Sequence, residues 1–145
     1  MGLDNYLSLI TKEELDLDKI PKYVKITKDD WSTKQNNDGF YYDICYWRKC
    51  WNIRHIMLNI LGVDINSWSN TYEFDKVERI IELRDKLLVY ICDPEIWEQD
   101  FNKGETIWNS EEMMPQICQE VINLGWLVRY LHGNSSARVK FIDSY

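Results

Sequence analysis

The sequence predicts an α+β fold in which about three long amphipathic helices pack on a small sheet of short strands. Apolar residues recur with helical spacing over three stretches, at residues 44–61, 70–92 and 115–131. Apolar and polar residues alternate over three shorter stretches, at residues 2–10, 23–27 and 137–141. The chain has 145 residues, of which 45% are hydrophobic and 14% aromatic, enough for the core of one domain covering residues 1–145.

The first predicted elements are a strand, a short helix and a loop. Within residues 2–10 the leucines fall mainly on one side of an extended chain. Thr11 and Glu14 have the spacing of a capping box, which predicts a short helix that ends before Pro21. Residues 28–39 are polar, contain Asn-Asn-Asp-Gly and lack periodicity, so they indicate an exposed loop after the second strand.

Two long helices are predicted in the middle of the chain. The helix over residues 44–61 ends at Gly62, a residue that favours the left-handed cap. The next helix opens near Asn70, because Asn70 and Glu73 have capping-box spacing. The Asp93-Pro94 pair ends this helix, since the residue before proline disfavours helical geometry.

The last part of the chain predicts a third long helix and a final strand. A helical turn over residues 95–101 and a turn at 102–104 connect the second helix to the third. Pro115 is suited to the first turn of the third helix. The run 132–134, His-Gly-Asn, predicts a left-handed cap at its end. The strand over residues 137–141 follows.

Charge and cysteine content restrict the class of protein. The net charge is −7, from 24 acidic and 17 basic residues, which opposes general nucleic-acid binding and suits a basic partner. The four cysteines form no C-x-x-C pair and only two histidines accompany them, so we expect no metal site. Cysteines in apolar stretches predict reduced thiols and a cytoplasmic setting. No signal peptide or membrane span is predicted.

Two arginines interrupt the apolar faces of the predicted helices. Arg54 lies in the middle of the apolar face of the helix over residues 44–61, flanked by Trp47, Trp51 and Leu58. Arg84 lies in the apolar stripe of the next helix. A guanidinium does not lose its proton, and an isolated buried charge costs several kcal/mol. Each arginine therefore needs a partner.

Two interpretations of these arginines stay open. Each guanidinium either pairs with an internal carboxylate, with Glu120 and Glu73 as candidates, or extends to water at the helix end. Alternatively, both converge on a cleft and bind an anionic ligand or the carboxylates of a partner. In that case Trp47 and Trp51 would form stacking walls.

The opposite side of the helix over residues 44–61 carries a polar stripe of Arg48, Asn52, His55 and Asn59. Polar residues belong on an exposed face, so ordinary surface is one interpretation. Arg48 and His55 are the further binding candidates on this stripe. Signatures of dinucleotide, phosphate or zinc-protease sites and of nucleophile elbows are absent. We therefore predict no catalytic residue, cofactor or metal, and enzymatic activity is not favoured.

Two segments carry a recognisable pattern: the opening Gly2-Leu3-Asp4-Asn5-Tyr6-Leu7, and Tyr46-Trp47-Arg48-Lys49 followed by Ile53. They resemble a family of small uncharacterised bacteriophage and prophage proteins that open G-L-D-M-Y-L and carry Y-W-R-K-x-x-x-I-H. Here Asn5 replaces the methionine, and Arg54 stands at the histidine position, with His55 one place later. The resemblance implies a viral or mobile-element origin and brings no activity with it.

Three classes of function follow. The leading hypothesis is a non-catalytic binding protein of phage or mobile-element origin that antagonises a bacterial defence or host protein by stoichiometric binding. The second is a pocket that sequesters a nucleotide signal through Arg54, Arg84 and the tryptophans. The third is a small hydrolase or transferase that uses Arg48, His55 and an acid from elsewhere. A homodimer is a further expectation, because a second copy would cover an arginine on an apolar face.

Overall fold

The computed structural model describes residues 4–29, 39–48, 50–64, 66, 71–93, 95–96 and 110–144, and for residues 51, 52, 110–112 and 144 the backbone alone. Five strands form one antiparallel sheet in the order β2-β3-β1-β5-β4. The strands are β1 Asp4–Thr11, β2 Thr27–Asp29, β3 Phe40–Arg48, β4 Thr71–Phe74 and β5 Arg138–Ser144. The first and last strands of the chain are therefore neighbours in the sheet.

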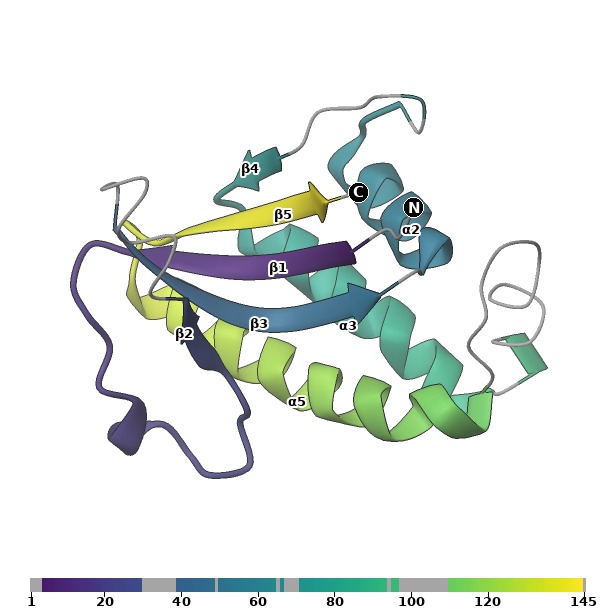
Figure 1. The fold of residues 1–145 in the computed structure, drawn as a ribbon, viewed down its shortest axis with the longest axis horizontal. Helices are drawn as coiled ribbons and strands as arrows, with labels where there is room; N and C mark the ends of the chain where they lie inside the picture. The colour runs from purple at the N-terminus through teal and green to yellow at the C-terminus, as the bar shows by residue number, and fades with distance from the viewer. Residues whose placement is uncertain are drawn as a thin grey trace.

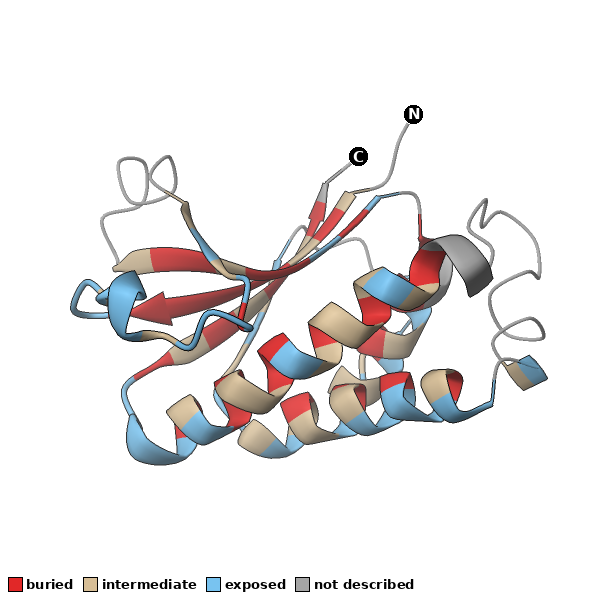
Figure 2. Ribbon diagram, turned by 90° about the horizontal axis from the view of Figure 1, so that it is seen from below, coloured by how far each residue is buried: buried red, intermediate tan, exposed pale blue. Residues whose placement is uncertain are grey.

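The described helices are α2 Trp51–Leu61, α3 Val77–Cys92 and α5 Ser110–Gly133, with a short 3-10 helix, η1, at Leu17–Lys19. Helices α3 and α5 run side by side beneath one face of the sheet (Figure 1), and the view from below shows the strands and these two helices as separate layers (Figure 2). Helix α2 lies near the end of β5 and contacts α3. The structure confirms the predicted α+β architecture.

The core lies between this face of the sheet and the helices. Alternate residues of each strand point into it, and the register aligns them across the sheet: Cys45, Leu7, Phe141 and Tyr72 form one row. Ile80, Leu83 and Leu87 from α3 and Ile117, Leu124 and Leu127 from α5 close the core from below. Burial of one such side chain contributes about 1.5–3 kcal/mol.

The opposite face of the sheet carries the other residue of each alternating pair. One row across it is Tyr46, Tyr6, Ile142 and Thr71, and the next is Asp43, Ser8, Lys140 and Glu73. None of the described helices covers this face (Figures 1 and 2). We call it the open face.

The predicted helix over residues 44–61 is wrong in its first part, because Phe40–Arg48 is strand β3. A β-bulge at Leu7/Ser8 shifts the pairing so that Ile44 is an extra residue between two ladder positions. The inward-facing residues before and after the bulge, Tyr42 and Cys45, are consequently three positions apart in the sequence. This is also the spacing of residues on one face of a helix. The aromatic content of the segment favours a strand. The helix proper ends as predicted at Gly62, whose φ is 70°.

The second helix also starts later than predicted. Thr71–Phe74 pairs with β5 as strand β4, and helix α3 starts at Val77 with Lys76 as its N-cap residue. The predicted capping box at Asn70 is therefore wrong, whereas the end before Asp93-Pro94 is confirmed. Of the predicted turn over 95–101, only 95–96 are described, and they are helical; the turn at 102–104 lies outside the described residues.

Helix α5 is longer than the predicted third helix. It contains Pro115 near its start and Gly133 as its last residue. The positive-φ glycines of the described chain are Gly39 and Gly62, so Gly133 does not supply the left-handed cap predicted for the run 132–134. Asn134 instead caps the helix end, because its Nδ2 donates to the carbonyl of Tyr130 at 2.8 Å.

Near the N-terminus, two boundaries differ from the predictions. Thr11 is the last residue of β1 and does not cap a helix; Asp16 caps the short η1 helix, accepting from the amide of Asp18 at 3.1 Å. The second strand is shifted to β2, Thr27–Asp29, so the predicted loop over 28–39 begins later, and its residues 30–38 lie outside the described chain.

Gly39 permits the close approach of β3 to β1. Its φ is 141°, and a Cβ placed there would lie 2.5 Å from the carbonyl oxygen of Thr11. Since no side chain fits at this distance, the pairing of Thr11 with Phe40 depends on a glycine before the strand.

Candidate functional site: a groove beside strand β3

Arg54 is buried, with 1% of its side chain exposed, and its Nε donates to Oδ2 of Asp143 at 3.0 Å. Asp143 lies near the end of β5 and also accepts from Nδ2 of Asn5. Burial raises the pKa of Asp143, while the bonds from Arg54 and Asn5 oppose this rise. Asp143 is therefore the internal carboxylate that Arg54 meets, in place of the predicted candidates, Glu120 and Glu73.

Arg84 has a different environment. Its side chain is partly exposed, and Nη2 lies 3.4 Å from Oδ1 of its neighbour Asp85. Its Nε is buried and bonds to no group in the described part of the chain. Arg54 and Arg84 thus meet different carboxylates, and neither arginine lines the groove beside β3. The predicted convergence on one cleft has no support in this geometry.

The remaining predicted site residues lie on two different elements. Trp47 and Arg48 are on strand β3 and His55 is on α2, so the predicted helical stripe linking Arg48 with His55 does not exist. Arg48 and His55 are exposed, and Trp47 is buried. The side chain of Trp51 lies outside the described residues.

A groove lies along the outer edge of β3. Strand β2 pairs only with Tyr41–Asp43, so the edge from Ile44 onward has no pairing with β2. Side-chain amides from α5 bind this edge: Nδ2 of Asn123 donates to the carbonyl of Ile44 and Nε2 of Gln116 to that of Tyr46, each at 3.0 Å. The groove has a volume of about 560 Å³.

The same helix also fixes the far wall of the groove. Asn123 accepts from the amide of Lys25 and donates to its carbonyl, both at 2.9 Å. Nε2 of Gln119 donates to the carbonyl of Tyr23 at 2.8 Å. Three amide side chains on one stripe of α5 therefore bind both β3 and the segment before β2, and residues of both line the groove.

Glu120 lines the groove at the centre of this amide stripe and is buried. Its Oε2 accepts from the indole Nε1 of Trp47 at 2.8 Å, and its Oε1 accepts from Nε2 of Gln116 at 2.7 Å. Burial raises the pKa of Glu120 from 4.5 to about 8, although both hydrogen bonds act in the opposite direction. The carboxyl is therefore mainly protonated at neutral pH.

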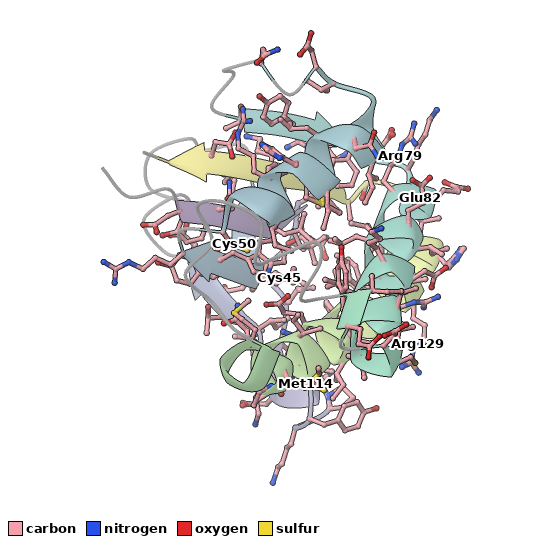
Figure 3. All side chains as sticks on the ribbon, turned by 90° about the vertical axis from the view of Figure 1, so that its right-hand side faces the viewer. Cys45, Cys50, Arg79, Glu82, Met114 and Arg129 are labelled. Atoms are coloured by element: carbon pink, nitrogen blue, oxygen red, sulfur yellow. The ribbon has the colours of Figure 1, made fainter. Side chains whose placement is uncertain are left out.

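Cys45 lines the same groove but is a poor nucleophile. Burial, and next the charge of Glu120, raise the pKa of its thiol well above 9.0. The thiolate, which is the reactive form, is thus disfavoured. Figure 3 shows Cys45 and Cys50 in the interior, whereas Arg79 and Glu82 lie on the outer side of the molecule, where they form an ion pair at 3.5 Å.

On the open face, next to the groove, two tyrosines pack together. The ring centroids of Tyr6 and Tyr46 are 4.9 Å apart, and the hydroxyl of Tyr46 donates to Oδ1 of Asp4 at 3.2 Å. Burial raises the pKa of Tyr6, and the charges of Asp4, Asp43 and Asp29 raise it further. We call these five residues the acidic–aromatic patch.

Sequence reasoning missed this site for two identifiable reasons. The sequence predicts Glu120 only as a possible partner for an arginine, and it predicts no role for the amides beside it. The signal was present: Gln116, Gln119, Glu120 and Asn123 share one stripe of a helix, at i, i+3, i+4 and i+7. The acidic–aromatic patch depends on pairing of β1 with β3, which the predicted helix at 44–61 concealed.

In the part of the chain that the structure describes, no group of three or more histidine, cysteine, aspartate or glutamate side chains is arranged to hold a metal ion. Among the described helices, none is long and apolar enough to cross a membrane. Comparison with protein-family models, with curated proteins and with solved structures finds no match to this chain.

Proposed function

We propose that this protein is a non-catalytic binding protein that associates stoichiometrically with a basic surface of a partner protein. The observation that carries the proposal is the acidic–aromatic patch on the open face, in which the Tyr6–Tyr46 pair lies among three carboxylates. Tyr46 is 43% exposed although its ring is held by a second ring and a hydrogen bond, so it is pre-ordered for contact.

The chemistry of the patch defines the partner. Tyrosine is enriched at protein interfaces, where its ring contributes apolar area at a small entropic cost. An arginine or lysine placed over such a ring gains a cation–π interaction of about 0.5–2 kcal/mol. The carboxylates of Asp4, Asp29 and Asp43 and the net charge of −7 would add attraction to a basic surface and repel an acidic one.

The class of partner follows from the resemblance to bacteriophage and prophage proteins. We propose a bacterial host or defence protein, which stoichiometric binding would antagonise. A protein that acts in this way needs no catalytic group, consistent with the unreactive environment of Cys45. The nucleotide-sequestering alternative gains nothing from Arg54, because an anionic ligand would have to displace Asp143 from it.

Quantitative affinity capture from bacterial extract tests the proposal, with wild type compared against Tyr46→Ala and Asp4→Lys. Val89→Ala is a matched control, because Val89 on α3 is also 43% exposed but lies away from the open face. We expect a partner whose recovery falls at least tenfold with each patch variant and is unchanged with the control. Equal recovery with all four proteins would contradict the proposal.

The binding of a captured partner should also depend on salt. Exposed charges are screened within about 8–10 Å at 0.1–0.15 M ionic strength. The association rate constant should therefore fall as salt is raised, and it should fall less steeply for Asp4→Lys. A nucleotide panel in a thermal-shift assay is the complementary measurement: stabilisation by a nucleotide, with no protein partner recovered, would favour the sequestering alternative.

A further inference from the structure

The groove beside β3 and the acidic–aromatic patch are one continuous surface. Tyr6, Asp43 and Tyr46 line the groove and also belong to the patch. A side chain that packs on Tyr46 can therefore enter the groove, where Glu120 is placed between the amides of α5. The groove volume of about 560 Å³ is within the range of roughly 300–1,000 Å³ that ligand sites occupy.

We propose that this groove binds an arginine side chain of the partner protein, whose guanidinium faces the carboxyl groups of Glu120 and Asp43. The inference rests on the proposed function and names the chemical group recognised there. The aliphatic part of the arginine would lie along the ring of Tyr46, and its planar head would enter beside the edge of β3.

The arrangement of acceptors selects a guanidinium. It offers five N–H donors in a fixed plane, and carboxylates are its preferred partners. Asp43 already accepts from Ser8 at 3.2 Å through one oxygen, so its other oxygen can accept from a ligand. Within the described part of the chain, Glu120 accepts from Trp47 and Gln116 and forms no ion pair, so a guanidinium in the groove would supply the opposite charge that the ionised form lacks.

The other charged and titratable groups of the groove define its electrostatics. Lys25, on the segment before β2, is the basic residue among the described lining residues, and it is exposed. From the sheet, Tyr6, Asp43, Cys45 and Tyr46 face the groove. An arriving cation therefore meets one exposed positive charge and the negative charges of Asp43 and of Glu120 when the latter ionises.

Binding of a cation should release the proton of Glu120. The carboxyl is mainly protonated at neutral pH in the free protein, and a guanidinium beside it favours the ionised form. Affinity should therefore increase as pH rises from 6 to about 8, by up to tenfold per pH unit, and then level off. This dependence separates a guanidinium at Glu120 from one that touches only the exposed patch.

The test is an NMR titration of the full chain with N-acetyl-arginine amide, with the uncharged N-acetyl-citrulline amide as the ligand control. The reporter is the indole N–H of Trp47, which donates directly to Glu120. We expect the arginine probe to shift this resonance, more strongly at pH 8 than at pH 6, and the citrulline probe to leave it in place. Glu120→Gln should weaken binding at pH 8 at least fivefold and remove the pH dependence, whereas Glu78→Gln on α3 should change neither.

Each other outcome overturns the inference. If the arginine probe shifts only Tyr6 and Tyr46, the cation stops at the patch and does not reach Glu120. If neither probe shifts the Trp47 resonance, or both do equally, the groove does not recognise a guanidinium. These measurements need no partner protein. The capture experiment can therefore contradict the proposed function while the titration supports arginine binding in the groove, and the reverse is also possible.

Discussion

Replacement of Glu120 by glutamine should make the protein less stable in acid and more stable in alkali. Glutamine has nearly the shape of the protonated carboxyl but does not ionise. It offers one oxygen as acceptor, whereas Trp47 and Gln116 each donate to a separate oxygen of Glu120. The substitution therefore disturbs about one hydrogen bond, which costs about 1 kcal/mol when the carboxyl is protonated.

The gain at higher pH follows from the shifted pKa. Folding raises the pKa of Glu120 from 4.5 to about 8, so between these values the folded state binds more protons than the unfolded state. The free energy of unfolding must then decrease as pH rises. The full effect is about 5 kcal/mol once the pH exceeds 8, since each pH unit contributes about 1.4 kcal/mol.

Urea denaturation followed by tryptophan fluorescence gives the measurement. The two proteins should differ by less than about 1 kcal/mol at pH 5, and Glu120→Gln should be more stable by about 2 kcal/mol at pH 7 and about 4 kcal/mol at pH 9. Other ionisable groups cancel in this difference, and Glu78→Gln on α3 controls for the loss of a carboxylate elsewhere. A constant difference between pH 5 and pH 9 would refute the assignment of a buried, protonated carboxyl.

Three further predictions concern the packing. Arg54→Met should lower the free energy of unfolding by about 3–5 kcal/mol, because it leaves Asp143 buried without its ion-pair partner. The double variant Arg54→Met/Asp143→Leu should recover much of that loss, as measured in a double-mutant cycle. In urea denaturation, Gly39→Ala should lower the free energy of unfolding by more than about 2 kcal/mol. Gly62 also has a positive φ but open space around it, so Gly62→Ala should lower the free energy of unfolding by about 1 kcal/mol. Cys92 is exposed and should react with a thiol reagent before the buried cysteines, whose reaction should follow global unfolding.

The sequence was sufficient for the architecture because the longest patterns were strong. The apolar stripe of α3 and the alternation in β5 each match one periodicity over many residues, and their burial follows that pattern. In β1 the alternation predicts the strand, although residues 7–11 are all buried. The left-handed cap at Gly62 could also be predicted, since few residues other than glycine adopt a positive φ. These are local properties of the chain.

The errors arise where pairing between distant segments determines the structure. The bulge in β3 exists because β1 lies beside it, and Thr71–Phe74 is a strand because β5 offers an edge. A capping-box spacing at Asn70 does not outweigh those ladder bonds. Tertiary pairing overrides local spacing in both cases.

The candidate site was only partly predictable for the same reason. Arg54 was correctly identified as a residue that needs a partner, but the partner comes from β5, 89 positions further along the chain. The groove brings together α5, β3 and the segment before β2, and no local pattern relates these three. The amide stripe of α5 could be seen in the sequence, but what it holds could not.

Arg54 and Glu120 represent two different solutions to the burial of an ionisable group. Arg54 cannot lose its proton, so its burial requires the carboxylate of Asp143, and the pair is complete within the chain. Glu120 can stay neutral, because burial raises its pKa by more than the hydrogen bonds from Gln116 and Trp47 lower it. Its ionised form is therefore incompletely stabilised in the free protein, and a cation entering the groove would complete it. A bound guanidinium would, for that reason, offset free energy that the fold loses when Glu120 ionises.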